Sequence, residues 1–160
     1  MIRFIVYSLV ATLMAASIWS INPPKCSFRT ELDICVKVSD GIEVDIDELD
    51  YAILYYVDRM SAARGIDPET LLEVVSQVNI TIVENPYEAL WDEELWLAGH
   101  YVHNKIVIAW LDGYRYNALF HELTHHVRQW WTKGIKDPRH EDKAWWNLIP
   151  YLKEFYNYED

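Results

Sequence analysis

Residues 114–131 read YRYNALFHELTHHVRQWW, a stretch without proline or glycine. Apolar side chains recur through it at helical spacing, which predicts one long amphipathic helix. Histidines and a glutamate occupy other positions of the same stretch, so the chemistry of the chain is concentrated on this helix. The side that faces the core would be formed by Leu119, Phe120, Leu123, Val127 and Trp130.

The stretch contains an HExxH motif, formed by His121, Glu122 and His125. Residues i and i+4 project from one side of a helix, so the two histidines can offer imidazole nitrogens to a single metal ion. Glu122 is the residue after His121, so it lies next to the metal position without binding the ion. There it can act as the general base toward a metal-activated water. Zn²⁺ is the expected ion because it accepts nitrogen and oxygen ligands and activates water. His126 falls on another side and is expected to be solvated.

A site of this kind needs a third ligand, and its position distinguishes the families. Position 128 is arginine and position 131 is tryptophan, which excludes the His-x-x-Gly-x-x-His pattern of the metzincins. Downstream, Glu141 is followed three residues later by Ala144. With the HExxH motif, this pair resembles the Glu-x-x-Ala signature of the gluzincins, the thermolysin-like metallopeptidases. The resemblance covers roughly residues 95–148, and it implies that Glu141 is the third zinc ligand.

Three neighbours compete with Glu141 for this role, namely Asp137, His140 and Asp142. His140 would complete a three-histidine site. The whole segment could instead be a solvated charge cluster at the N-terminus of a helix, where acidic residues are favourable. The third ligand therefore stays open between Glu141 and His140.

The resemblance implies a zincin metallopeptidase that hydrolyses peptide bonds in a peptide or protein substrate. In such enzymes an edge strand before the active helix pairs with the substrate backbone, and residues 95–101 or 105–110 could supply it. His100, Tyr101 and His103 would then line the cleft, or else be polar tips of a hairpin.

Two other functions are compatible with the same residues. One is a non-catalytic, envelope-attached module with a structural zinc bound by His121, His125, His140 and Glu141, since structural zinc sites leave no open position. The other is a hydrolase of a non-peptide amide such as a cell-wall cross-link. The number of protein ligands around the metal distinguishes the first of these from an enzyme.

The expected fold class is α+β, zincin-like, with a small mixed or antiparallel sheet packed on the HExxH helix and a C-terminal helix. Hydrophobic periodicity and capping residues predict helices over 44–64 and from 67 onward, and a strand over 79–84. Residues 88–94 are predicted as an acidic loop or short helical turn, and residues 95–101 and 105–110 as strands joined around His103 and Asn104. A last helix is predicted over 141–156, with Trp145 and Trp146 packing it against the active helix.

The N-terminus carries an export signal or an anchor. Residues 4–21 are uncharged over 18 positions, which matches a signal-peptide core and a minimal membrane span; a buried helix is the alternative. Residues 1–25 are therefore assigned to a signal peptide or membrane anchor and residues 26–160 to the zincin-like domain. Cys26 and Cys35 are nine residues apart, which favours a hairpin-closing disulfide over a zinc site and fits export; free thiols would fit a cytoplasmic protein.

The charge of the chain limits its partners. The 160 residues have a net charge of -11, which excludes nucleic acid and an anionic membrane surface as electrostatic partners. Residues 26–100 hold 17 acidic and 4 basic residues, whereas residues 101–160 hold 8 of each. A monomer is expected, with an acidic first half that favours basic or neutral peptides over acidic ones.

Overall fold

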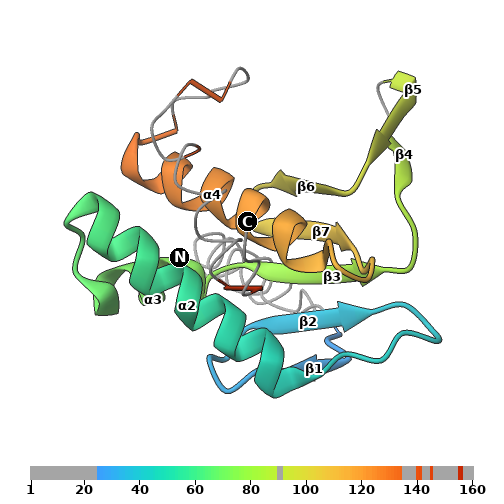
Figure 1. Cartoon of the computed structure of the whole chain (residues 1–160), viewed down its shortest axis with the longest axis horizontal. Coiled ribbons are helices and arrows are strands. Elements are labelled where there is room, and N and C mark those ends of the chain that lie inside the picture. Colours follow the sequence, from blue (N-terminus) through green and yellow to red (C-terminus); the bar gives the residue numbers. More distant parts are fainter. Residues whose placement is uncertain (1–24, 90–91, 135–139, 142–144, 146–154, 157–160) are drawn as a thin grey trace, which may run out of the picture.

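The computed structural model describes residues 25–89, 92–134, 140–141, 145 and 155–156 (Figure 1). The predicted signal peptide or anchor lies outside these residues, as do Asp137, Asp142 and most of the predicted last helix. Within the described ranges, no helix combines the length and the apolar character that a membrane span requires.

The centre of the fold is a five-stranded mixed sheet with the strand order β1-β2-β3-β7-β6. The inner pairs β2–β3 and β3–β7 are parallel, and the outer pairs β1–β2 and β6–β7 are antiparallel. This arrangement is compatible with the expected α+β class and with its mixed sheet. The five strands are β1 Phe28–Arg29, β2 Cys35–Val38, β3 Asn79–Val83, β6 Gly99–Val102 and β7 Lys105–Ala109.

Three helices are present in the described part of the chain, α2 Ile46–Arg64, α3 Pro68–Val75 and α4 Arg115–Trp131. Each begins within two residues of its predicted start. Asp45 caps α2 by accepting a hydrogen bond from the amide of Glu48, and Gly65 ends it in the left-handed conformation. Asp67 caps α3 through the amide of Thr70. The predictions for these helices are confirmed.

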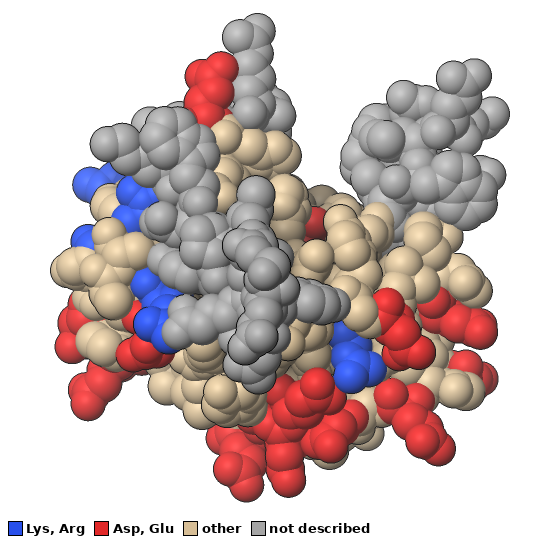
Figure 2. Space-filling model, in the orientation of Figure 1, with Lys and Arg blue, Asp and Glu red and all other residues tan. Residues whose placement is uncertain are grey.

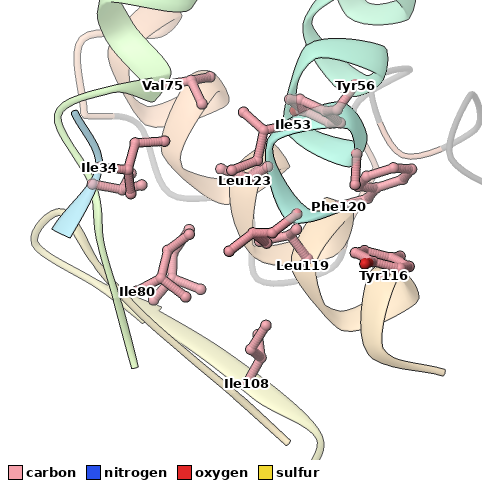
Figure 3. Close-up of a cluster of buried hydrophobic side chains, with 14 of the residues drawn as sticks. Ile34, Ile53, Tyr56, Val75, Ile80, Ile108, Tyr116, Leu119, Phe120 and Leu123 are labelled. Atoms are coloured by element: carbon pink, nitrogen blue, oxygen red, sulfur yellow. The ribbon is translucent and has the colours of Figure 1, made fainter. Parts of the chain in front are cut away.

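The hydrophobic core lies between the sheet and the helices α2 and α4 (Figure 3). Alternate residues of the strands face it, such as Ile80 and Ile82 in β3 and Ile106 and Ile108 in β7. From α4, the core receives Tyr116, Leu119, Phe120, Leu123 and Val127. Four of the five predicted core residues of this helix are confirmed, whereas Trp130 is 43% exposed.

The turn between β6 and β7 is the one that the sequence predicted. His103 and Asn104 both have positive φ values, 48° and 63°, as a two-residue hairpin turn of the favoured twist requires. This turn places β6 at the edge of the sheet, next to α4 in Figure 1.

The segment before β6 differs from its prediction. Strands β4 Tyr87–Ala89 and β5 Asp92–Leu97 pair antiparallel in a separate two-stranded sheet, where an acidic loop or helical turn was expected. The predicted strand over 95–101 is also divided at Ala98, because β5 belongs to this ribbon and β6 to the main sheet. Acidic residues are rare in strands, so their pairing was not visible in the local sequence.

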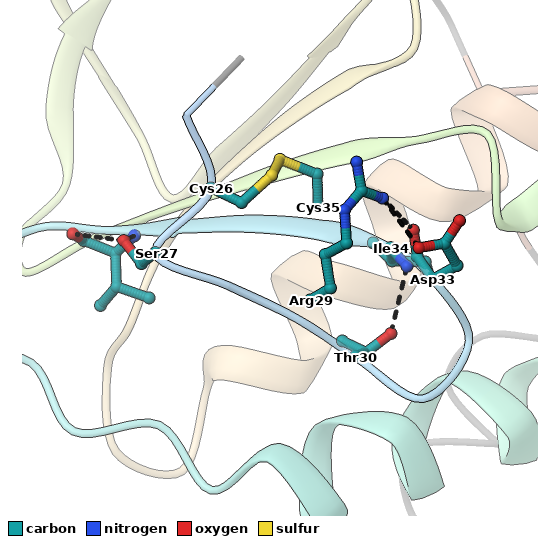
Figure 4. The surroundings of a disulfide bond; sticks show 8 residues. Cys26, Ser27, Arg29, Thr30, Asp33, Ile34 and Cys35 are labelled. Carbon is teal, nitrogen blue, oxygen red and sulfur yellow. Dashed lines mark hydrogen bonds and ion pairs between the residues drawn. A yellow bond between two sulfur atoms is a disulfide. The ribbon is translucent and has the colours of Figure 1, made fainter. Parts of the chain in front are cut away.

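The predicted disulfide is present and links Cys26 to Cys35, with Cα atoms 5.4 Å apart (Figure 4). It lies beside the β1–β2 hairpin, whose turn is also held by a salt bridge of 2.9 Å between Arg29 and Asp33. A disulfide at this position is compatible with an exported protein.

Acidic side chains dominate one part of the visible surface. In Figure 2 they gather along the lower edge, where α2 begins and β1 and β2 lie, and basic side chains are fewer. The acidic edge in this view is thus formed by elements of the acidic first half of the sequence.

Candidate metal centre

Three histidines converge beside helix α4. His121 and His125 lie one turn apart on the helix, and His140 reaches them from the chain that follows it. One ring nitrogen of each lies within 4.8 Å of the others, and the Nε2 atoms of His125 and His140 are 3.4 Å apart. Among the described residues these three side chains form a group that could hold a metal ion.

One of the ligand separations matches a small tetrahedral ion, while the three ligand atoms together lie within 4.8 Å of one another. Zinc–nitrogen bonds of about 2.0–2.1 Å at tetrahedral angles separate neighbouring ligand atoms by about 3.3–3.4 Å. The 3.4 Å between the Nε2 atoms of His125 and His140 agrees with this edge length. Burial, with a smaller contribution from nearby His140, lowers the pKa of His121 to about 4. At neutral pH His121 is therefore in the uncharged form that binds metals.

Glu141 is not a member of this group, although the resemblance implied it as the third ligand. The described structure brings the alternative, His140, to the two helical histidines instead. The Glu141 side chain is exposed. The other two competitors for the third position, Asp137 and Asp142, lie outside the described residues.

The carboxyl group of Glu122 is buried between α4 and the edge strand. The residue is 4% exposed, and its Oε2 atom has no hydrogen-bond partner among the described residues. Burial raises the pKa of this carboxyl to about 8. Its Oε1 atom lies 3.0 Å from the point where a Cβ atom on Gly99 would stand. Glu122 therefore occupies the space that the missing side chain of Gly99 leaves beside β6.

His126 is buried, so the prediction that it would be solvated is wrong. It is 4% exposed, its Nε2 lies 2.8 Å from the carbonyl oxygen of Val74, and its Nδ1 lies 3.1 Å from the hydroxyl of Tyr101. The side of α4 that carries His126 is covered by α3 and β6, whose positions the helical spacing alone does not reveal. His126 thus joins α4 to both elements.

Tyr101 lies beside the histidine group. The sequence left two alternatives for this residue, a place in the lining of the cleft or at the polar tip of a hairpin. Its ring is parallel to that of His125, with centroids 6.5 Å apart, and its hydroxyl donates to Oδ1 of Asn104 at 3.3 Å. His100 also lies in β6, and burial lowers its pKa. His103 is exposed in the hairpin turn. The ring of Tyr101 therefore stacks parallel to a histidine of the candidate metal group.

Trp145 is a site residue whose contacts the sequence did not reveal. Its indole is 8% exposed and packs against the rings of His121, His125 and His140. The sequence predicted that Trp145 would pack against the active helix, but not that it would contact the histidines. A tryptophan five residues after a histidine has no fixed spatial relation to it outside a regular element, so no local pattern indicated these contacts.

Comparisons of the chain with protein-family models, with curated proteins and with solved structures find no match in any of the three.

Proposed function

We propose that the protein is a zinc-dependent metallopeptidase, with His121, His125 and His140 as the metal ligands and Glu122 as the general base. One observation carries the proposal: both histidines of the HExxH motif meet a third histidine, and the glutamate of the same motif is buried. The resemblance to gluzincins supports the reaction type but implied Glu141 as ligand. The proposal names His140 instead of Glu141 as the third ligand, because His140 lies within 4.8 Å of the ligand atoms of His121 and His125.

The donor set fits Zn²⁺, which is commonly bound by neutral imidazoles in tetrahedral sites. When bound, Zn²⁺ would polarise a substrate carbonyl and lower the pKa of a coordinated water to about 7. Three protein ligands, the number found in the described part of the chain, leave one position open for this chemistry. A structural zinc site would have four, so the number of protein ligands in the zinc-loaded protein distinguishes an enzyme from the non-catalytic zinc module.

Glu122 would move the proton. Its buried Oε2 atom has no hydrogen-bond partner among the described residues, so this oxygen is available to accept a proton. This oxygen would accept the proton of the attacking water and then donate it to the leaving amine nitrogen. The pKa of about 8 suits a group that must both take and release a proton, and a bound cation nearby would lower it.

Strand β6 would bind the substrate backbone. It is the last strand of the sheet in the order β1-β2-β3-β7-β6, and an edge strand can pair with an extended peptide through main-chain hydrogen bonds. Gly99 begins this strand and lies against Glu122. A peptide added along β6 would therefore pass close to the general base.

The disulfide supports action outside the cytoplasm. The segment over residues 4–21 would direct the protein there, either as a cleaved signal or as an anchor. We place the proposed peptidase in the cell envelope or the extracellular space.

The decisive experiment compares the full chain, purified with its disulfide intact, with the variant Glu122→Gln. Both should bind one zinc ion by elemental analysis. Cleavage of a proteome-derived peptide library, followed by mass spectrometry, should fall by about 10²–10⁴-fold in the variant, because it cannot transfer the proton. Glu141→Gln is the matched control, and it should retain both zinc and activity.

Four results would contradict different parts of the proposal. Equal activity of Glu122→Gln would remove Glu122 as the base. Absence of bound zinc in the wild-type protein would remove the metal centre. Loss of zinc from Glu141→Gln but not from His140→Ala would restore Glu141 as the third ligand. Bound zinc without peptide cleavage would favour the structural module or another amide substrate.

A further inference from the structure

The rings around the candidate metal centre have a regular arrangement. The centroids of His121, His125 and His140 form an almost equilateral triangle with sides of 4.9, 5.0 and 5.1 Å. The ring of Trp145 lies 4.9, 4.6 and 4.3 Å from the same three centroids. The indole is therefore nearly equidistant from the three imidazoles and stands over one face of their triangle.

An indole cannot be a ligand in this position. Its only polar group is an N–H donor without a lone pair for a metal, so the ring closes that face of the triangle to metal ligands. Trp145 also belongs to the buried hydrophobic cluster of the protein, which shows that this face is turned to the interior. Water and substrate then have to reach a metal ion from the opposite face.

The contacts of Trp145 also restrict the three imidazoles. A histidine ring that binds a metal must hold one rotamer, and contacts of the surrounding shell supply this orientation in metal sites. One buried aromatic ring that touches all three side chains limits their rotation together. This effect reduces the entropy that the ligands lose when the metal binds.

We infer that Trp145 is a positioning residue of the metal centre, which backs the three imidazoles and leaves the opposite face of their triangle for substrate. The inference rests on the proposed function, since it assumes that the three histidines bind a metal. It adds a residue outside the HExxH motif and a direction of access.

The test is a zinc titration of the full chain against a chromophoric chelator, for Trp145→Ala, Trp145→Phe and the wild type. Trp145→Ala should bind zinc about ten-fold or more weakly, the usual effect of losing an outer contact of a metal ligand. Trp145→Phe should recover at least part of the loss, because it keeps an aromatic ring. Trp130→Ala is the matched control, since it removes a 43% exposed indole from α4 and should leave zinc affinity unchanged.

A spectroscopic measurement separates positioning from general destabilisation. The visible absorption of bound Co²⁺ reports ligand geometry, so it should change in Trp145→Ala and be restored in Trp145→Phe. If Trp145→Ala lacks a native circular dichroism spectrum, Trp145→Leu replaces it, because leucine retains apolar volume without an aromatic plane.

The inference is overturned if the affinity of Trp145→Ala stays within ten-fold of the control, or if Trp145→Phe recovers nothing. Tighter binding by Trp145→Ala would also overturn it, because the indole would then block the metal position. All of these results presuppose zinc binding by the wild type. Failure of the wild type to bind zinc would count against the proposed function. It is therefore distinguishable from a failure of the inference about Trp145.

Discussion

At the scale of single residues, Gly99 and Glu122 illustrate how closely the edge strand β6 approaches helix α4. A Cβ atom on Gly99 would stand 3.0 Å from Oε1 and 3.1 Å from Cγ of Glu122. These distances are shorter than ordinary van der Waals contacts. The conformation of Gly99 does not itself require glycine, because its φ lies outside the left-handed region. A side chain at position 99 would therefore require Glu122 to shift, because the Val107 carbonyl oxygen at 3.3 Å limits the space on its other side.

This contact predicts the effect of Gly99→Ala. The added methyl group should displace the Glu122 side chain and lower the free energy of unfolding by about 1–3 kcal/mol, the usual cost of overpacking. Zinc binding should persist, whereas peptide cleavage should fall because the general base has moved. Urea unfolding and the two functional assays measure these effects.

The double variant Gly99→Ala/Glu122→Ala provides the control. Removing the Glu122 carboxyl should relieve the clash, so the two substitutions should be clearly non-additive in unfolding free energy. Additive effects would show that the methyl group is accommodated without contact with Glu122.

At the scale of elements, the short helix α3 depends on its N-terminal cap. Asp67 accepts hydrogen bonds from the amide and the hydroxyl of Thr70, at 2.9 and 3.0 Å, and Pro68 begins the helix. These hydrogen bonds, the amide bond first, lower the pKa of Asp67. The same helix supplies the Val74 carbonyl that lies 2.8 Å from His126, so the cap also supports the surroundings of the candidate metal centre.

The lowered pKa predicts how Asp67→Asn changes the pH dependence of stability. A carboxyl whose pKa is lower in the folded protein stabilises it above the unfolded pKa, and this contribution is lost as the pH falls through the folded pKa. Asparagine also caps helices but does not titrate in this range. The melting temperature of wild type should therefore exceed that of Asp67→Asn at pH 7, and the difference should shrink below about pH 4.

Melting curves between pH 7 and pH 3 test this expectation. Asp40→Asn, which removes an exposed carboxyl from a turn, controls for the loss of one negative charge. A melting-temperature difference that is independent of pH would mean that the charge of Asp67 contributes nothing to the cap.

At the scale of the whole molecule, the candidate metal centre connects parts of the chain that are separate in sequence. His121 and His125 belong to α4, while His140 follows the end of this helix by nine residues. A bound ion would link the helix to this later segment. Because the unfolded chain has no preformed site, the binding free energy would stabilise the folded state.

Zinc should therefore raise the stability of the protein measurably. At a free zinc concentration 100 times the dissociation constant, the expected increase in unfolding free energy is about 2.7 kcal/mol. A chelator should reverse it. Thermal melts of the full chain with zinc and with chelator measure the effect.

The variant His140→Ala is the control for this prediction, because it retains both histidines of α4. At the same zinc concentration its stabilisation should be clearly smaller than that of the wild type. An equal increase in both proteins would show that His140 contributes nothing to zinc binding.

The sequence by itself determined the elements and the pair of histidines on one side of α4. The caps at Asp45 and Asp67, the hairpin turn at His103 and Asn104, and the i, i+4 spacing of His121 and His125 are local relations, which backbone geometry converts directly into structure. The pairing of Cys26 with Cys35 was equally accessible, because only these two cysteines exist.

Only the tertiary structure decided which distant residues meet. It brought His140 to His121 and His125, covered His126 with α3 and β6, paired the acidic strands β4 and β5, and set Trp145 against three histidines. The physical reason is that these contacts depend on how helices and strands pack. Packing follows from the combined burial of the whole apolar surface, and no short window of sequence contains it.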